Sequence, residues 1–246
     1  GSHNFASDRE FGDRALRAMP EIPALVRDNR DFLRRVVRYL CEHGIDQFLD
    51  IGSGIPTVGN VHEIAQAALP AARVVYVDHD PVAVTHGMAL LADNPLATAI
   101  LGDIRDPAGV LRSATATGLL DLSRPVGVLM IAVLPFVSDE EDAAGVVEAH
   151  LQPLARGTYL AISHGRTDAQ QEFRDAVKVY DDKARSPNPI TLRTPAGIAA
   201  LFGGLTLVDP GVVLVPRWRP DPIDDRLAGI DVGDDYPVMA GLGRRD

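Results

Sequence analysis

The sequence predicts an α/β fold in which a doubly wound, mostly parallel sheet carries helices on both faces. Short apolar stretches alternate with helical stretches through the middle of the chain. Several of these stretches, such as VGVLMIAVL at 126–134, are apolar at nearly every position, which is typical of parallel strands buried on both faces. The stretches LTLVDPGVVLVP and YPVMAGLG near the end are strand-like with little helix between them, which predicts an antiparallel pair closing the sheet's edge.

The first 45 residues predict a helical extension that precedes a domain at 46–246. Over 22–40 the apolar residues recur at spacings of three and four, which predicts an amphipathic helix that ends before Gly44. A shorter helix is expected at about 8–18. Residues 1–3 read as a tag remnant and take no part in the argument.

The alternating part of the domain predicts five strands, each followed by a helix or a helical or loop stretch. The strands are expected at 47–51, 73–78, 98–103, 126–134 and 158–163. Helices are expected at 61–69, 81–93 and 140–155. Asn60 followed by Glu63 predicts a capping box at the start of the first of these helices.

Composition excludes several classes of partner. The chain of 246 residues has 24 Lys and Arg against 34 Asp and Glu, and a formal charge of −10 argues against a nucleic-acid partner. The lone Cys41 fits a reducing compartment. There is no apolar run long enough to span a bilayer and no signal peptide, so we expect a cytoplasmic protein without a membrane partner.

A glycine-rich loop, DIGSGIPTVGN at 50–60, follows the first strand. Gly52 and Gly54 match the first two glycines of the dinucleotide fingerprint, but Thr57 stands where the third is required. Pro56 also removes a backbone donor that a phosphate would use. The loop is therefore poorly suited to a pyrophosphate on a helix N-terminus.

A nucleoside ligand without phosphates, such as S-adenosylmethionine, suits this loop better. Asp50 places a carboxylate where the ammonium of the ligand's amino-acid part could bind. Asp78, at the end of the next strand, is positioned to accept hydrogen bonds from ribose hydroxyls. Asp103 follows the third strand and could accept from an adenine amino group, with Ile104 near the ring. All three acids lie where open α/β sheets bind ligands.

In this order the stretches DIGSG, YVDHDP, LGDIRDP, VGVLMIAVLPFVSDEED and YLAISH resemble class I S-adenosylmethionine-dependent methyltransferases. The chain is similar over nearly its whole length to an actinobacterial family of S-adenosyl methyltransferases once listed as a domain of unknown function. The resemblance implies a Rossmann-like, seven-stranded sheet with an antiparallel last strand. It also implies S-adenosylmethionine as the cofactor.

The resemblance implies cofactor-binding roles for residues that match the family's motifs. Those at the methionine end, the ribose, the adenine and the transfer site are Asp50, Gly52, Gly54, Asp78, His79, Asp103, Ile104, Ala132 and Val133. Pro135 stands where a histidine is common in the family. The resemblance implies no particular substrate.

We therefore expect a methyltransferase acting on a small-molecule acceptor. His164, at the end of the strand at 158–163, is a candidate general base, and the alternative is a structural histidine at a strand end. No metal is expected, because Gln66 stands where the zinc motif that begins at His62 needs its second histidine. Two other functions stay open: a cofactor-binding regulator without transfer activity, and a nicotinamide-dependent oxidoreductase. A homodimer is also possible.

Overall fold

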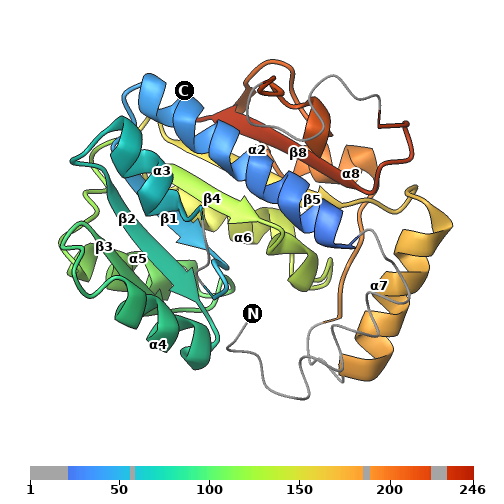
Figure 1. The fold of residues 1–246 in the computed structure, drawn as a ribbon, viewed down its shortest axis with the longest axis horizontal. Coiled ribbons are helices and arrows are strands. Elements are labelled where there is room, and N and C mark those ends of the chain that lie inside the picture. Colours follow the sequence, from blue (N-terminus) through green and yellow to red (C-terminus); the bar gives the residue numbers. More distant parts are fainter. Residues whose placement is uncertain (1–21, 56–58, 185–188, 223–231) are drawn as a thin grey trace.

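The computed structural model describes residues 22–55, 59–184, 189–222 and 232–246. Helices cover both faces of one mixed sheet (Figure 1), as the alternation of apolar and helical stretches predicts. The helix expected at 8–18 lies outside the described residues.

The sheet has the order β3-β2-β1-β4-β5-β8-β6, with β7 also paired to β8. The strands are β1 (Gln47–Ile51), β2 (Arg73–Asp78), β3 (Ala97–Leu101), β4 (Gly127–Ile131), β5 (Tyr159–Gly165), β6 (Thr206–Leu207), β7 (Val213–Leu214) and β8 (Val238–Arg244). Strands β1 to β5 are parallel, and β8 is antiparallel to β5. The antiparallel last strand is thus confirmed, and it lies between β5 and the edge.

The sheet has seven positions but eight strands, because the outer position beside β8 is shared by β6 and β7. The single strand-like stretch at 205–216 is interrupted at Asp209, Pro210 and Gly211. Proline has no N–H to donate to β8, and Gly211 has a positive φ of 87°, so the chain turns away before pairing again.

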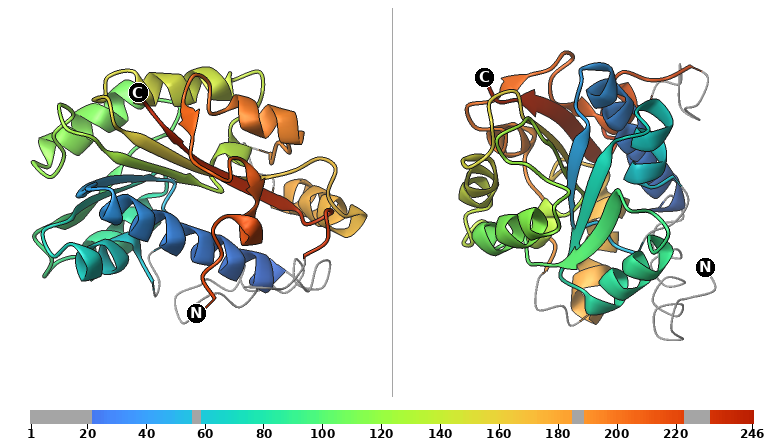
Figure 2. Two further views of the ribbon diagram at one scale, coloured as in Figure 1. Left: turned by 90° about the horizontal axis from the view of Figure 1, so that it is seen from above. Right: turned by 90° about the vertical axis from the view of Figure 1, so that its left-hand side faces the viewer.

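Two groups of helices form the outer layers (Figure 2). On one face lie α2 (Ile22–Glu42), α3 (Val61–Ala68) and α4 (Pro81–Leu90). The other face carries α5 (Pro107–Ala116), α6 (Ala143–Leu151) and α8 (Pro195–Ala200). The remaining helices are α7 (Gln171–Ala184), η1 (Leu134–Phe136) and η2 (Val215–Arg217). Of the helices in the structure, α7, α8 and the short η1 and η2 have no counterpart in the sequence-based prediction.

Local sequence signals explain several helix ends. The capping box of α3 is confirmed, with the Glu63 carboxylate accepting from the Asn60 N–H at 2.9 Å. The helix expected at 140–155 is shorter in the structure, where α6 spans Ala143–Leu151. Its first turn begins only after Asp142, whose side chain accepts from Gly145 N at 3.0 Å, and Pro153 follows its last turn.

Helix α2 is the main apolar support of the sheet. Its residues Phe32, Val36 and Leu40 are fully buried and share one core cluster with strands of the sheet. The ring of Phe32 meets that of the fully buried Trp218 edge to face, with centroids 5.3 Å apart. This helix therefore packs as a layer of the same core, and the division of the chain at residue 45 stays a prediction.

The carboxyl ends of β1 to β5 meet along one edge of the sheet, and α7 lies beyond that edge (Figure 1). In open α/β sheets this edge is where ligands bind. In the part of the chain that the structure describes, no helix is long and apolar enough to cross a membrane.

Candidate active site

The glycine-rich loop is fastened to the end of β2 by its backbone. Gly52 N and Ser53 N donate to Val77 O at 2.8 and 3.2 Å, and Gly54 N donates to Asp78 Oδ2 at 2.7 Å. The loop is thus held in place before any ligand binds, which is a form of preorganisation.

The two glycines serve different purposes. At Gly52, φ is 75° and an added Cβ would lie 2.3 Å from Val133 Cγ2, so only glycine lets this loop meet the loop after β4. At Gly54, φ is 65° and an added Cβ would meet nothing within 4 Å, so only the left-handed backbone favours glycine here. Of the two glycines, Gly52 lines the cavity beside Asp50 and Gly54 does not.

Asp50 brings a carboxylate to a cavity of about 220 Å³. The side chain is buried, and no N–H or O–H within the described ranges donates to its oxygens. Burial, followed by the nearby charge of Asp78, raises the pKa of Asp50 to about 7, and Arg30 opposes this shift. A cation placed in the cavity would pair with Asp50 and restore its ionised form.

The cavity is formed by α2, the glycine-rich loop, the start of α3, and the ends of β2 and β4. Its lining residues are Val26, Asn29, Arg30, Leu33, Asp50, Gly52, Ser53, Ile55, Gly59, Asn60, Val61, Tyr76, Ile131 and Ala132. Of the sequence-predicted residues it brings together Asp50, Gly52 and Ala132. The other predicted residues do not line the cavity. They lie at or after the ends of β1 to β4 and are Gly54, Asp78, His79, Asp103, Ile104 and Val133.

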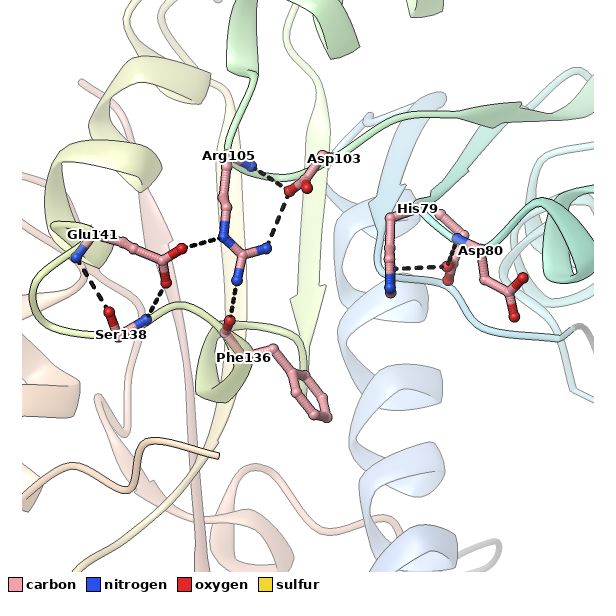
Figure 3. Close-up of polar contacts among 8 residues, drawn as sticks. His79, Asp80, Asp103, Arg105, Phe136, Ser138 and Glu141 are labelled. Carbon is pink, nitrogen blue, oxygen red and sulfur yellow. Dashed lines mark hydrogen bonds and ion pairs between the residues drawn. The ribbon is translucent and has the colours of Figure 1, made fainter. Parts of the chain in front are cut away.

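Asp78 is already engaged by the backbone. Its carboxylate is buried and accepts from Gly54 N at 2.7 Å and Asp80 N at 2.9 Å. The neighbouring His79 is exposed, with Nδ1 3.4 Å from Asp78 Oδ1 (Figure 3). Asp78 therefore holds the loop in shape in addition to any contact it makes with a ligand.

Asp103 belongs to a polar network that links the loops after β3 and β4 (Figure 3). Its Oδ1 accepts from the backbone N of Arg105 at 2.9 Å and from Nη1 at 3.2 Å. Arg105 also donates to Glu141 at 2.6 Å and to the carbonyl of Phe136. Ile104 points the other way into the core cluster on the α5 and α6 face. Sequence reasoning missed Arg105, which carries no motif.

A second cavity, of about 290 Å³, adjoins the first. It is lined by Leu25, Val26, Asn29, Ala132, Pro135, Phe136, His164, Gly165, Phe173, Ala176, Val177, Ile190, Leu192 and Val238. Three of these residues, Val26, Asn29 and Ala132, line both cavities. Apart from Asn29 and His164, the described residues of the second lining are apolar.

His164 lies at the end of β5 with both ring nitrogens occupied. Nδ1 is 2.8 Å from Gly165 O, and Nε2 is 2.7 Å from Arg193 Nη1, so Nδ1 donates and Nε2 accepts. Burial, with the charge of Arg193, lowers the pKa of His164 to about 4. A neutral imidazole with no available lone pair does not support the predicted general-base role, and the geometry fits the structural alternative.

Arg193 organises the wall that carries Pro135 and Phe136. The guanidinium is buried and donates to Val137 O at 2.7 Å, Leu134 O at 3.1 Å and the Asp139 carboxylate at 2.8 Å. It therefore fixes η1 and the loop that follows. This role could not be predicted, because Arg193 lies in a segment without periodicity.

No group of three or more His, Cys, Asp or Glu side chains is placed to hold a metal ion in the described ranges. His62, where a zinc motif would have begun, is instead in contact with Tyr76 at 2.8 Å.

Comparisons with known proteins point to methyltransferases. The family model described as S-adenosyl methyltransferase matches residues 1–246. A DUF574 family protein from Streptomyces avermitilis is 41% identical, with a TM-score of 0.90, over 100% of this chain and 93% of that one. A proposed methyltransferase from Thermobifida fusca is 37% identical, also at 0.90, over 100% and 91%.

A more distant similarity shows the fold alone. The N-methyltransferase NodS from Bradyrhizobium japonicum, in complex with S-adenosyl-L-homocysteine, is 13% identical with a TM-score of 0.50 over 86% of this chain and 85% of that one. No curated protein matches the chain.

The residues present fit S-adenosylmethionine. Its ammonium matches the buried carboxylate of Asp50, to which no protein group in the described ranges donates, and Gly52 and Ser53 line the same cavity. The cavity needs no phosphate-binding helix end, in keeping with Pro56 and the missing third glycine. The chain belongs to the S-adenosyl methyltransferase family, and it is a methyltransferase that depends on S-adenosylmethionine.

Proposed function

We propose that the protein transfers the methyl group of S-adenosylmethionine to a small-molecule acceptor bound in the apolar cavity. The observation that carries this proposal is the wall shared by the two cavities at Val26, Asn29 and Ala132. A methyl donor in the first cavity and an acceptor in the second would meet at this wall. The volume of about 290 Å³ lies near the lower end of ligand pockets, which span roughly 300–1,000 Å³.

Each predicted cofactor residue receives a proposed role. Asp50 pairs with the ammonium, and the backbone at Gly52 borders the amino-acid part. Asp78 accepts from the ribose hydroxyls while it holds Gly54, and the exposed His79 lies beside it. Asp103 accepts from the adenine amino group through Oδ2, which makes no contact within the described ranges.

The loops after β4 and β1 would position the cofactor relative to the methyl acceptor. Ala132 has a positive φ of 56° and lies in the shared wall, and Val133 packs on Gly52. These residues would fix the distance between donor and acceptor. Ile104 supports the adenine site from the core, beneath Asp103.

S-adenosylmethionine supplies an activated methyl group, so the protein's task is positioning and exclusion of water. The backbone hydrogen bonds of the glycine-rich loop hold the first cavity in shape before ligands bind, and the Arg193 contacts do the same for the second. No proton transfer by His164 is needed in this scheme.

Calorimetric titration with S-adenosylmethionine, S-adenosylhomocysteine and NAD tests the cofactor assignment. We expect binding of the first two and none of comparable strength for NAD. Transfer of a radiolabelled methyl group into fractions of a cell extract tests the reaction itself. Cofactor binding without transfer into any fraction would favour the regulatory alternative. The homodimer, the cytoplasmic location and the lack of a nucleic-acid partner stay predictions.

A further inference from the structure

The hydroxyl of Tyr76 joins β2 to the start of α3. It lies 2.8 Å from the backbone N of His62 and 2.8 Å from the Nδ1 atom of the same residue. The two rings meet at 90° with their centroids 5.8 Å apart, and both side chains are buried. Because His62 lies in the first turn of α3, this contact fastens the start of the helix to the sheet.

Each group in this contact has a defined role. The backbone N–H of His62 can only donate, so the Tyr76 oxygen accepts there. Burial lowers the pKa of His62, an effect that the charge of Glu63 opposes, and burial also raises the pKa of Tyr76. The imidazole is therefore neutral and the phenol keeps its proton, which it donates to Nδ1.

The segment that this contact holds is part of the cavity at Asp50. The stretch at 59–61 lines that cavity and comes directly before His62. The carboxylate of Glu63 accepts from two N–H groups of the stretch, at 2.7 and 2.9 Å, and so ties it to its own helix. The contact with Tyr76 ties the same segment to the sheet.

Tyr76 makes this link beside the carboxylate that the cofactor would meet. Asp50 and Tyr76 are partners in the parallel register of β1 and β2, and both line the cavity. The start of α3 is therefore anchored to the residue next to Asp50 in the sheet. A ligand in this cavity would be bounded by Asp50 and by the stretch at 59–61.

We propose that His62 and Tyr76 are positioning residues for the cofactor; this inference rests on the function proposed above. Their contact holds the stretch at 59–61 in the position in which the cavity accepts S-adenosylmethionine. Neither residue takes part in the methyl transfer, and their effect is on cofactor affinity. Since the contact exists before the ligand binds, it reduces the cost of ordering this part of the site on binding.

Calorimetric titration with S-adenosylhomocysteine tests the pair in the full-length protein. Tyr76→Phe keeps the ring but removes the hydroxyl and both of its contacts with His62, so the affinity should fall roughly tenfold. His62→Leu removes Nδ1 but keeps the backbone N–H, so the affinity should fall less, by roughly threefold to tenfold. His62→Asn offers a side-chain oxygen in place of Nδ1 and should recover most of the lost affinity.

The double variant shows whether the two residues act through each other. Tyr76→Phe protein has no hydroxyl for Nδ1 to contact, so adding His62→Leu should reduce the affinity further by less than about twofold. Losses that simply add would overturn the inference, and so would wild-type affinity in either single variant.

His150→Leu is the matched control for a merely structural effect. His150 is also a buried helical histidine, with Nδ1 2.9 Å from Val146 O, and it belongs to α6 on the opposite face of the sheet (Figure 2). Its substitution should leave the affinity for S-adenosylhomocysteine unchanged, whatever it does to thermal stability. An equal loss of affinity in His62→Leu and His150→Leu would show that general destabilisation weakens binding, and the positioning role would fall.

Asp50→Asn separates a failure of this inference from a failure of the proposed function. Wild-type affinity in the His62 and Tyr76 variants, beside weak binding by Asp50→Asn, would overturn the positioning role alone. Wild-type affinity in all of these variants would show that the cofactor binds outside the cavity at Asp50, and it would overturn the proposed site as well.

Discussion

The two adjoining cavities differ in how they are built and in what they offer a ligand. The cavity at Asp50 is lined by α2, the glycine-rich loop, the start of α3 and the ends of β1, β2 and β4, and it holds a buried carboxylate. The cavity at His164 takes its walls from α2, η1, β5, α7, β8 and the segment at 190–192, and its lining is almost wholly apolar. The buried carboxylate of Asp50 therefore lies where the cofactor would bind, and the site proposed for the acceptor is apolar.

The difference extends to what holds each cavity in shape. The cavity at Asp50 is held by hydrogen bonds between the loop after β1 and the end of the neighbouring strand β2, such as Gly52 N to Val77 O and Gly54 N to Asp78. The apolar cavity depends on Arg193, which reaches across to Leu134 O and Val137 O. Changes in the first should therefore affect cofactor binding, and changes in the second should affect the acceptor.

The largest effect is expected from Gly52→Ala, which breaks the contact between the two loops. The new Cβ would lie 2.3 Å from Val133 Cγ2 at a φ of 75°. Backbone strain and overpacking together should lower the free energy of unfolding by roughly 2–5 kcal/mol. Thermal or urea unfolding measures the loss.

Gly118→Ala is the matched control for this change. Gly118 has nearly the same φ, 74°, with no atom within 4 Å of an added Cβ. It should therefore show only the strain of the backbone, about 1–2 kcal/mol. Equal losses in the two variants would mean that Val133 moves aside at no cost and that its contact with Gly52 does not fix the two loops.

Asp50→Asn is expected to weaken cofactor binding while it stabilises the free protein. Without its charge the side chain cannot pair with an ammonium, so affinity for S-adenosylhomocysteine should fall roughly tenfold to a hundredfold. The pKa of Asp50 is raised from 3.8 to about 7, so its ionised form destabilises the free protein above pH 7 and this cost disappears toward pH 4.

The free Asp50→Asn protein should therefore unfold at a higher temperature than wild type at pH 8, and the gain should vanish at pH 4. Calorimetry and thermal unfolding test both parts. A variant that binds as tightly as wild type would remove Asp50 from the site.

Asp78→Ala should weaken cofactor binding more than Asp78→Glu does, by roughly tenfold. The alanine variant loses the proposed ribose contact together with the bonds from Gly54 N and Asp80 N. Circular dichroism should show a native fold in both variants. Unchanged affinity in a natively folded alanine variant would leave Asp78 with its loop-holding role only.

The smallest expected effect is a dependence of cofactor affinity on pH. Asp50 has a pKa of about 7 in the free protein, and pairing with the ammonium would lower it, so binding releases a proton and strengthens as pH rises. From pH 8 to pH 6 the affinity for S-adenosylhomocysteine should fall by about tenfold in wild type. In Asp50→Asn the affinity should change little between pH 8 and pH 6. The same pH dependence in both proteins would contradict the pairing of Asp50 with the ammonium.

The same contrast explains how much could be predicted from sequence. The proposed cofactor residues Asp50, Asp78 and Asp103 each lie at or just after the end of a strand in a regular alternation, so one rule about strand ends was enough to group them. Five parallel strands and the capping box at Asn60 were predictable because short local patterns encode them. The antiparallel last strand was predictable because two strand-like stretches near the end have little helix between them.

The apolar cavity has no such signature. Its walls come from residues as far apart in the chain as Leu25 and Val238, and Arg193 acts through backbone carbonyls that any residue could supply. The engagement of His164 by Arg193 is likewise a tertiary contact, which is why the sequence left the roles of general base and structural histidine open. The split of the edge strand into β6 and β7 depends on pairing with β8, another long-range contact.

A crystal structure of the protein with S-adenosylhomocysteine tests the central claim most directly. The account predicts the ligand's ammonium within hydrogen-bonding distance of the Asp50 carboxylate. It also predicts the sulfur at the wall formed by Val26, Asn29 and Ala132, facing the apolar cavity. A sulfur that faces away from that cavity, or an ammonium paired elsewhere, would contradict the account.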